Sequence, residues 1–424
     1  MAAACCAAEN GQRVVMLDNN RALGGQIWRG EGVGAGRAQR TDSPAADAIQ
    51  WIERVYRAGV SVIAGAQVYD AHPARDATEF ASAQAETAAG RCDVRCRKLI
   101  IATGARERFL PFPGWTLPGA YGAGGLQAMV KAGLPVAGKR VVVAGSGPLL
   151  LAVAAFLRSS GADVRLVAEQ APAARLAEFG LDLLRQPARA AQALRLQRQL
   201  LGVRYLPGCW ITSARGDGKL TSVNLQRGTR TWEVACDLLA CGFHLAPNLE
   251  LPMLLGCGLR NGFVQVNEYQ ESSRPGIFCA GEITGIGGVD LSLLEGQIAG
   301  HACAGNLGQA LGLQAQRDRQ REFGRRLGRT FALRNELKGL AAPDTVVCRC
   351  EDVTRQQLEP YAAASWREAK LHTRCGMGAC QGRVCGAAVE FLYEWQADGV
   401  RPPLFPVRLE SLMAMDGREG ETTA

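Results

Sequence analysis

Residues 140–150 read RVVVAGSGPLL. Four apolar residues followed by Gly145 and Gly147 predict a buried strand that turns directly into a helix, as at the start of a dinucleotide-binding unit. Gly145 permits a tight turn, and Gly147 lets the backbone come close to a pyrophosphate. Glu169 ends the next predicted strand, where a carboxylate accepts hydrogen bonds from ribose hydroxyls. These three residues form a candidate nucleotide site.

Two residues of the same stretch depart from the G-x-G-x-x-G pattern. Leu150 stands where a third glycine allows close packing of helix on strand, and Pro148 removes a backbone donor from the phosphate cradle. Both changes weaken a phosphate site without excluding it. The residues therefore leave two interpretations open: this unit binds a second nucleotide, NAD or ATP, or it retains the fold and binds none.

A second unit of the same kind is indicated at the start of the chain. Asp18 ends the run RVVMLD (13–18), the position from which a carboxylate holds the ribose of an adenine dinucleotide. The glycine loop lies ~20 residues before that acid in such folds, so it would fall at or before Met1. We therefore expect the N-terminal strand and glycine loop to be missing from this chain and the natural protein to begin upstream of Met1.

Composition limits the class of protein. The chain has 424 residues, 47% of them hydrophobic and 21% charged, which suggests two to three ordinary globular domains. The net charge of +8 comes mostly from scattered arginines and indicates no nucleic-acid-binding arm. Glycines and Pro148 interrupt the longest uncharged stretch, residues 141–157, and residues 1–10 lack the basic start of a signal peptide. We expect a cytoplasmic protein with at most peripheral membrane association.

The 15 cysteines are unusual in number, and an odd count argues for reduced thiols or metal ligands instead of a disulfide framework. Cys348 and Cys350 form a C-x-C pair, and Cys380 and Cys385 follow with four residues between them. Four thiolates from two such pairs can hold zinc or a [2Fe–2S] cluster, and the spacing alone does not choose between them. Cys375 precedes Cys380 by the same spacing, so the spacing does not exclude it as a ligand.

Two helices are expected around these cysteines. Thr354 and Gln357 form a plausible capping box for a helix that Pro360 interrupts. A second helix is expected from near Gly386 to Ala397. Its N-terminus would lie beside Cys385, where the positive end of the helix dipole stabilises an anionic cluster.

Five motifs together carry a resemblance to a known family. They are LGGQIWR (23–29), ATG (102–104), PFPGWTLPG (111–119), IFCAGE (277–282) and TRCGMGACQGRVC (373–385). Their order resembles that of flavoproteins with two dinucleotide-binding domains. More narrowly, the chain resembles the α subunits of opine oxidases and D-hydroxyproline dehydrogenases, with hydrogen cyanide synthase as a related enzyme.

The resemblance implies two cofactors, FAD and a [2Fe–2S] cluster. It favours the cluster over zinc and free thiols, and it implies Cys348, Cys350, Cys380 and Cys385 as ligands, because the family often has a small residue in place of Cys375. Glu282 stands where the family usually has an aspartate for the ribityl chain. The expected flavin-binding residues are Asp18, Gly24, Gly25, Gln26, Thr103, Gly104, Gly281, Glu282 and Gly288.

The resemblance also implies the architecture. The chain is expected to be an α/β protein with two interleaved Rossmann-like domains of the pyridine nucleotide-disulfide oxidoreductase type. A small α-rich [2Fe–2S] domain, similar to bacterioferritin-associated ferredoxin, is expected to follow them. The expected segments are 1–133 with 250–308 (FAD-binding domain, truncated at its N-terminus), 134–249 (second dinucleotide-binding domain), 309–342 (helical linker), 343–398 ([2Fe–2S] domain) and 399–424 (extended tail).

The implied function is that of an electron-transferring FAD/[2Fe–2S] subunit in a heteromeric dehydrogenase or oxidase. Its substrate would be a secondary amine or imino acid such as an opine or D-hydroxyproline. Substrate chemistry would lie on a β subunit with its own FAD, a small ferredoxin-like subunit is a further expected partner, and no catalytic residue is assigned to this chain. Two alternatives remain: a subunit of a hydrogen cyanide synthase, with glycine as substrate, and a non-catalytic assembly subunit.

Overall fold

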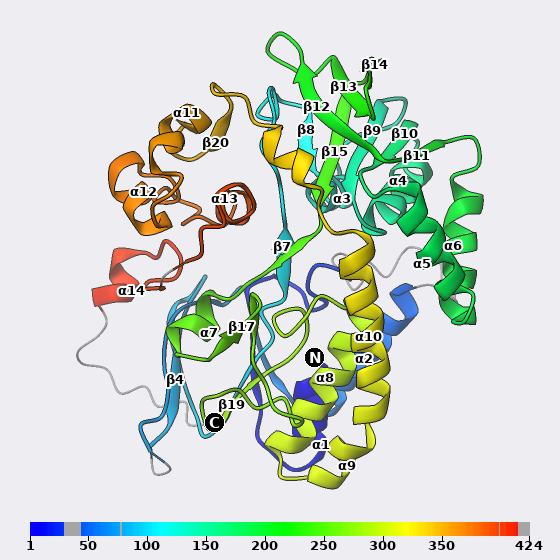
Figure 1. Ribbon diagram of the computed structural model, residues 1–424. Helices are drawn as coiled ribbons and strands as arrows, with labels where there is room; N and C mark the ends of the chain where they lie inside the picture. The colour runs from blue at the N-terminus through cyan, green and yellow to red at the C-terminus, as the bar shows by residue number, and fades with distance from the viewer. Residues whose placement is uncertain (29–43, 77–78, 398, 414–424) are drawn as a thin grey trace. The chain divides into compact units, whose positions relative to one another are not determined.

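The computed structural model describes residues 1–28, 44–76, 79–397 and 399–413, with only the backbone of residues 44–46. Its contacts divide the chain into two compact units, each made of separate stretches of sequence (Figure 1). The first unit comprises Met1–Arg106, Pro247–Arg325 and Gly399–Ala424, and the second comprises Glu107–Ala246 and Arg326–Asp398. This division does not test the finer domain boundaries given above, which stay predictions.

The first unit combines short parallel strands with helices from both ends of its sequence. Its elements are α1 (Ala2–Glu9), β1 (Val15–Asp18), α2 (Pro44–Arg57), β2 (Ser61–Ala64), β3 (Gln67–His72), β4 (Ala81–Thr87), β5 (Gly90–Cys96), β6 (Leu99–Ile101), α7 (Glu250–Leu254), β17 (Leu259–Arg260), β18 (Phe263–Val264), β19 (Ile277–Cys279), α8 (Gly288–Cys303), α9 (Leu307–Gly312) and α14 (Leu409–Met413). Three elements lie where the chain passes between the units: β7 (Ala105–Glu107), β16 (Leu245–Pro247) and α10 (Gln314–Thr330).

Parallel pairing in the first unit brings together strands that are distant in sequence. β1 pairs with β2, and β19 pairs with β6 so that Ile277 lies opposite Leu99. β3, β4 and β5 form a separate antiparallel sheet. The loops that follow β1, β6 and β19 carry the predicted flavin-binding residues, so the carboxyl ends of parallel strands position them, as expected for this class of fold.

α1 packs closely against α8 (Figure 1), and two glycines of α8 allow this contact. A Cβ atom at Gly296 would lie 3.1 Å from the Ala2 Cβ, and one at Gly300 would lie 2.4 Å from the Ala3 carbonyl oxygen. The backbones can therefore approach only because both positions lack a side chain. The contact with α8 therefore fixes the position of α1.

The second unit is built on a five-stranded parallel sheet in the order β11-β10-β9-β15-β8 (Figure 1). Its elements are β8 (Ala120–Gly122), α3 (Ala123–Lys131), β9 (Arg140–Ser146), α4 (Leu149–Ser159), β10 (Asp163–Glu169), α5 (Ala173–Leu183), α6 (Pro187–Gln199), β11 (Arg204–Pro207), β12 (Cys209–Arg215), β13 (Ser222–Arg227), β14 (Arg230–Ala235) and β15 (Leu238–Phe243). β12, β13 and β14 form a separate antiparallel sheet.

The run RVVVAGS forms β9, as its apolar composition predicts, and every residue after Arg140 is buried. Gly145 has a φ of 138°, and a Cβ atom there would lie 1.8 Å from the carbonyl oxygen of Gly242 in β15. Close strand packing therefore requires this glycine whether or not the unit binds a nucleotide. Leu150 is 1% exposed and fills the core beneath α4, the place that the third glycine of the motif would leave open.

The cysteine-rich segment folds within the second unit. Its elements are η1 (Asn335–Gly339), β20 (Val346–Cys348), β21 (Val353–Thr354), α11 (Arg355–Leu358), η2 (Glu359–Tyr361), α12 (Trp366–Thr373) and α13 (Gly386–Tyr393). The predicted capping box is present, with the Thr354 backbone N–H donating to the Gln357 Oε1 at 2.8 Å. The helix predicted from Gly386 begins there but ends at Tyr393, because Glu394 takes a left-handed conformation (φ 61°).

The C-terminal tail, which was expected to be extended, contains a short helix. Residues 409–413 form α14, and the Tyr69 hydroxyl of β3 donates to the Ser411 carbonyl oxygen at 3.1 Å. The Leu404 N–H also donates to the Tyr69 carbonyl oxygen at 2.7 Å. The tail thus gains backbone partners on the first unit.

Among the described residues, no helix has the length and apolar composition that a bilayer crossing requires.

Candidate functional site

The loop after β1 holds the first group of predicted flavin-binding residues. Asp18 Oδ1 accepts hydrogen bonds from the backbone N–H of Asn20 at 2.8 Å and from its side-chain amide at 2.9 Å. Gly24 has a φ of 119°, and a Cβ atom there would lie 3.0 Å from the Cβ of Trp28. Gly25 also has a positive φ, 59°, so the loop requires glycine at both positions. Gln26 is exposed beside them.

Asn248 anchors the loop after β6, which carries Thr103 and Gly104. The Thr103 hydroxyl donates to the Asn248 carbonyl oxygen, and the Asn248 side-chain amide donates to the Thr103 carbonyl oxygen, both at 2.8 Å. The Asn248 N–H donates to the Gly104 carbonyl oxygen at 2.9 Å. The sequence contains no local signal for this anchor, because the partners are 145 positions apart.

Gly281, Glu282 and Gly288 come together where β19 leads into α8. Glu282 Oε1 accepts a hydrogen bond from the Gly288 N–H at 2.8 Å, at the N-terminus of α8. Glu282 Oε2 is buried and has no hydrogen-bond partner among the described residues. Burial raises the pKa of this carboxyl. An unsatisfied buried acceptor is costly unless a ligand supplies a donor, so the loop fits a group with hydroxyls, such as the ribityl chain of a flavin.

Glu295 supports this loop and was not predicted as a site residue. It is fully buried in α8, and its Oε2 accepts from the Gly281 N–H at 2.9 Å and from the Thr284 hydroxyl at 2.5 Å. Arg321 of α10 donates to its Oε1 at 2.8 Å and neutralises the buried charge. A lone acid within the apolar run LSLLEGQIAG (291–300) is the sequence signal that could have identified it.

The structure also brings together the three residues of the second candidate nucleotide site. Glu169 Oε2 accepts a hydrogen bond from the Gly147 N–H, and its Oε1 accepts one from the Ala171 N–H, both at 2.8 Å. The side chain is fully buried, and burial raises its pKa to about 7. Both carboxylate oxygens are therefore already hydrogen-bonded within the unit, unlike the free oxygen of Glu282.

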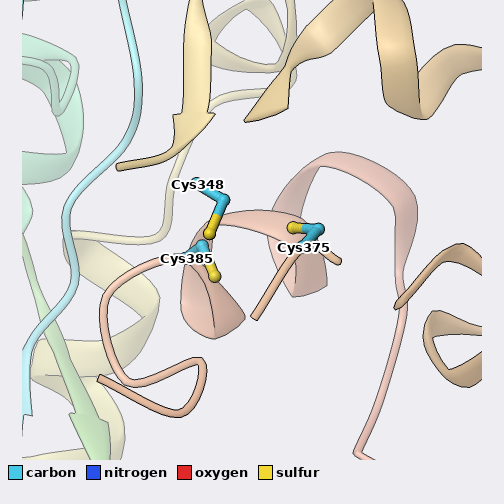
Figure 2. Close-up of side chains that lie close together, drawn as sticks. All are labelled: Cys348, Cys375 and Cys385. Atoms are coloured by element: carbon cyan, nitrogen blue, oxygen red, sulfur yellow. The ribbon is translucent and has the colours of Figure 1, made fainter. Parts of the chain in front are cut away.

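Three buried cysteines form the core of the cysteine-rich segment, and Figure 2 shows their sulfur atoms directed toward one another. Cys348 ends β20, Cys385 caps the N-terminus of α13, and Cys375 follows α12. Their sulfur atoms all lie within 4.8 Å of one another. Cys350 is exposed and is hydrogen-bonded to Cys380 beside this group. Among the described residues, the group that could hold a metal therefore comprises Cys348, Cys375 and Cys385, and the predicted ligands Cys350 and Cys380 lie outside it.

The environment of these thiols suits a metal centre. Hydrogen bonds from the thiols of Cys375 and Cys385 lower the pKa of the Cys348 thiol far below its ordinary value, and the Gly376 N–H donates to its sulfur at 3.4 Å. The hydrogen bond to Cys348 in turn raises the pKa of Cys375 to about 12 and also raises that of Cys385, so one of the three thiols is the stabilised thiolate. A stabilised thiolate is the form that binds a metal. The structure therefore fits a thiolate-bound cluster, and it places Cys375, which the resemblance leaves out, beside two predicted ligands.

A tryptophan and three glycines shape the loop that carries these cysteines. Cβ atoms at Gly376, Gly382 and Gly386 would each lie within about 3 Å of the Trp366 ring, at 3.0, 3.1 and 2.8 Å. Arg374 donates to a Glu351 carboxylate oxygen at 2.7 Å and ties this loop to the segment that follows Cys348. The backbone at these three glycines therefore passes too close to the Trp366 ring to leave room for a side chain.

Comparison with known proteins agrees with this geometry. The family model described as pyridine nucleotide-disulphide oxidoreductase matches residues 1–307. An opine oxidase subunit from Rhizobium meliloti (strain 1021) is 30% identical over an alignment 437 positions long, which covers 95% of this chain and 93% of that protein. Hydrogen cyanide synthase subunit HcnB from Pseudomonas aeruginosa is 34% identical over 334 residues, 69% of each chain.

Solved structures show the same fold. L-proline dehydrogenase from P. horikoshii aligns with a TM-score of 0.68 at 18% identity and covers 97% of this chain and 77% of its own. Thioredoxin reductase from Lactococcus lactis aligns with a TM-score of 0.52 at 17% identity, over 74% of this chain and 95% of its own. The resemblance to the opine oxidase and hydrogen cyanide synthase subunits is therefore confirmed, and so is the two-domain α/β fold. The chain belongs to the pyridine nucleotide-disulphide oxidoreductase family.

Proposed function

We propose that this chain is the electron-transferring FAD/[2Fe–2S] subunit of a heteromeric dehydrogenase or oxidase that oxidises a secondary amine or imino acid, such as an opine or D-hydroxyproline. The observation that carries the proposal is the similarity to the Rhizobium meliloti opine oxidase subunit along 95% of the chain. That length includes the cysteine-rich segment, which lies outside the residues matched by the family model. The proposal places the protein in the cytoplasm, in keeping with its unpaired cysteines.

The first unit would hold FAD through the loops at the ends of β1, β6 and β19. A bound flavin accepts two electrons from a donor and releases them singly. Glu282 would accept a hydrogen bond from a flavin hydroxyl through its free Oε2, while Glu295 keeps the Gly281 turn in place. The positive N-terminal end of α8 would face the same group. The residues proposed to bind FAD are Asp18, Gly24, Gly25, Gln26, Thr103, Gly104, Gly281, Glu282 and Gly288.

The cysteine-rich segment would hold the [2Fe–2S] cluster through Cys348, Cys350, Cys380 and Cys385. Cys385 lies at the N-terminus of α13, whose dipole stabilises an anionic cluster there. Cys375 would remain a buried thiol beside the ligands. The cluster would pass single electrons onward, toward a small ferredoxin-like partner or another acceptor.

The partner would be a β subunit with its own FAD, on which the substrate is oxidised. Relatives of this chain are subunits by name, one of opine oxidase and one of hydrogen cyanide synthase, and this supports a heteromer. The similarity to HcnB also supports a second candidate, a subunit of a synthase that forms cyanide from glycine. Because the two candidate enzymes would share the same subunit architecture, the substrate must be identified on the assembled enzyme.

The test is co-expression of this chain with the protein encoded beside its gene, followed by flavin, iron and sulfide quantitation on the purified complex. The proposal predicts flavin on this chain and two iron and two sulfide per copy, with turnover of an opine, D-hydroxyproline or another secondary amine. Cyanide formed from glycine would select the second candidate. A complex in which this chain holds neither flavin nor iron would show a non-catalytic assembly subunit instead.

A further inference from the structure

The carboxyl ends of β9 and β10 are the place where a doubly wound sheet binds a nucleotide. Ser146 ends β9 between the two glycines of the loop, and Gln170 directly follows Glu169 at the end of β10. Within the second unit, the segment that follows α10 contacts both residues. We call this segment, Phe331–Arg334, the strap.

Four hydrogen bonds hold the strap on the two strand ends. The Ser146 hydroxyl donates to the Phe331 carbonyl oxygen at 2.9 Å. The Gln170 side-chain amide donates to the carbonyl oxygens of Phe331 and Ala332 at 3.4 and 3.3 Å, and its Oε1 accepts from the Arg334 N–H at 3.2 Å. The same amide donates to the Ser146 hydroxyl at 2.9 Å, which joins the two strand ends into one network.

Aromatic contacts fix both ends of the strap. Phe331 is 4% exposed and meets Phe179 of α5 edge to face, with ring centroids 5.8 Å apart. The Arg334 guanidinium lies 4.6 Å from the ring centroid of Trp210 in β12. The strap is therefore a packed part of the second unit.

The acid at the end of β10 is inaccessible in the folded unit, and so are the two residues that hold the strap. Glu169 and Gln170 are 0% exposed, and Ser146 is 3% exposed. Both oxygens of Glu169 already accept backbone hydrogen bonds, from Gly147 and Ala171. The space beside Gly147 is open, so the closure affects the ribose end of the site and not the turn of the glycine loop.

We propose that Ser146 and Gln170, by holding the strap over the ends of β9 and β10, exclude adenine nucleotides from the second dinucleotide-binding domain. The domain then keeps its fold and its Gly145–Gly147 turn for strand packing and takes neither NAD(H) nor ATP. These two polar residues determine specificity, since they keep a nicotinamide nucleotide from exchanging electrons with the enzyme at this domain. The inference concerns nucleotide binding alone and does not rest on the identity of the amine substrate.

The test is equilibrium binding of NADH and ATP to the full chain by isothermal titration calorimetry. We expect no saturable binding of either nucleotide to the unaltered protein up to millimolar concentration. The double variant Ser146→Ala/Gln170→Ala, which loses the side-chain bonds to the strap, is expected to gain saturable binding of at least one nucleotide. Gln226→Ala is the matched control, because it loses a side-chain bond to Gly228 in the β13–β14 hairpin and should gain no binding.

Two results would overturn the inference. One is micromolar binding of NADH or ATP by the unaltered protein, with loss of binding in Glu169→Ala, because the ribose end would then be accessible. The other is a folded double variant that binds neither nucleotide, because Ser146 and Gln170 would then not be what excludes them. If the double variant does not fold, the single variant Gln170→Ala gives the same comparison. Flavin and iron content are measured on the same samples. Their absence would count against the proposed function, whereas the nucleotide titrations test the inference about the strap alone.

Discussion

Two glutamates, Glu282 and Glu169, distinguish the two candidate nucleotide-binding regions at the residue scale. Glu282 in the first unit keeps one carboxylate oxygen without a partner among the described residues, whereas both oxygens of Glu169 in the second unit accept backbone hydrogen bonds. A buried acceptor without a hydrogen-bond partner favours a site at which a bound ligand donates that bond. A buried acceptor that already has its partners within the chain favours a site that binds no ligand. This contrast supports a flavin in the first unit and a closed second unit.

The buried carboxyl of Glu169 predicts a specific dependence of stability on pH. Its pKa rises from 4.5 to about 7 in the folded chain because of burial, so the folded state binds its proton more tightly than the unfolded state does. Its contribution to the free energy of unfolding is complete below about pH 4.5 and is lost as the pH rises through about 7. The loss corresponds to about 3 kcal/mol.

The measurement is urea unfolding of the unaltered protein and of Glu169→Gln at pH 5 and pH 8. The unaltered protein should lose more stability across this interval than the variant, which carries no titrating group at this position. A pH-independent offset from the altered hydrogen bonds to Gly147 and Ala171 does not affect the comparison. Equal slopes for the two proteins would show that Glu169 does not titrate in this range.

The proposed ligand set predicts which cysteine the cluster does not need. Cys375→Ala should retain the full iron content, whereas Cys380→Ser should lose most of it, because four thiolates complete a [2Fe–2S] site. Iron and sulfide assays, together with the visible spectrum of the cluster, make the comparison. Loss of iron in Cys375→Ala, with retention of iron in Cys380→Ser, would show that Cys375 is a ligand and that Cys380 is not.

At the scale of elements, local patterns predict strands well and long-range contacts poorly. The apolar run that forms β9 and the capping box at Thr354 were both predicted, because each depends on neighbouring residues. The strap was not predicted, because its bond to Ser146 joins residues 185 positions apart and leaves no periodic pattern. The position of Cys375 also depends on how the loop folds, and its spacing alone could not show it beside Cys348 and Cys385.

The close packing of α1 on α8 gives a prediction at this scale. Gly300→Ala places a Cβ atom 2.4 Å from the Ala3 carbonyl oxygen and 2.9 Å from the Cys6 Cβ, so α1 must shift. We expect a destabilisation of about 1–3 kcal/mol in urea unfolding. Gly308→Ala in α9 meets nothing within 4 Å and should leave stability unchanged or slightly higher. Equal stability of the two variants would mean that α1 does not depend on this contact.

At the scale of the whole molecule, the chain joins the fold of the pyridine nucleotide-disulphide oxidoreductase family to a segment in which three buried cysteines lie together. The family model covers the fold, and the similarity to the opine oxidase subunit extends through the segment. The chain has no C-x-x-C pair, the motif of dithiol–disulfide chemistry in many redox proteins. The proposed route of electrons therefore runs through a flavin and a cluster.

The most direct test of this account is an anaerobic titration of the purified heteromer with its amine substrate, followed by optical and low-temperature electron paramagnetic resonance spectroscopy. The account predicts that substrate bleaches the flavin absorbance and produces the signal of a reduced [2Fe–2S] centre. In Cys380→Ser it predicts the bleaching without the cluster signal. Bleaching of the flavin in the unaltered enzyme, with its iron–sulfur cluster present and still oxidised, would contradict the proposal that this protein carries electrons from flavin to cluster.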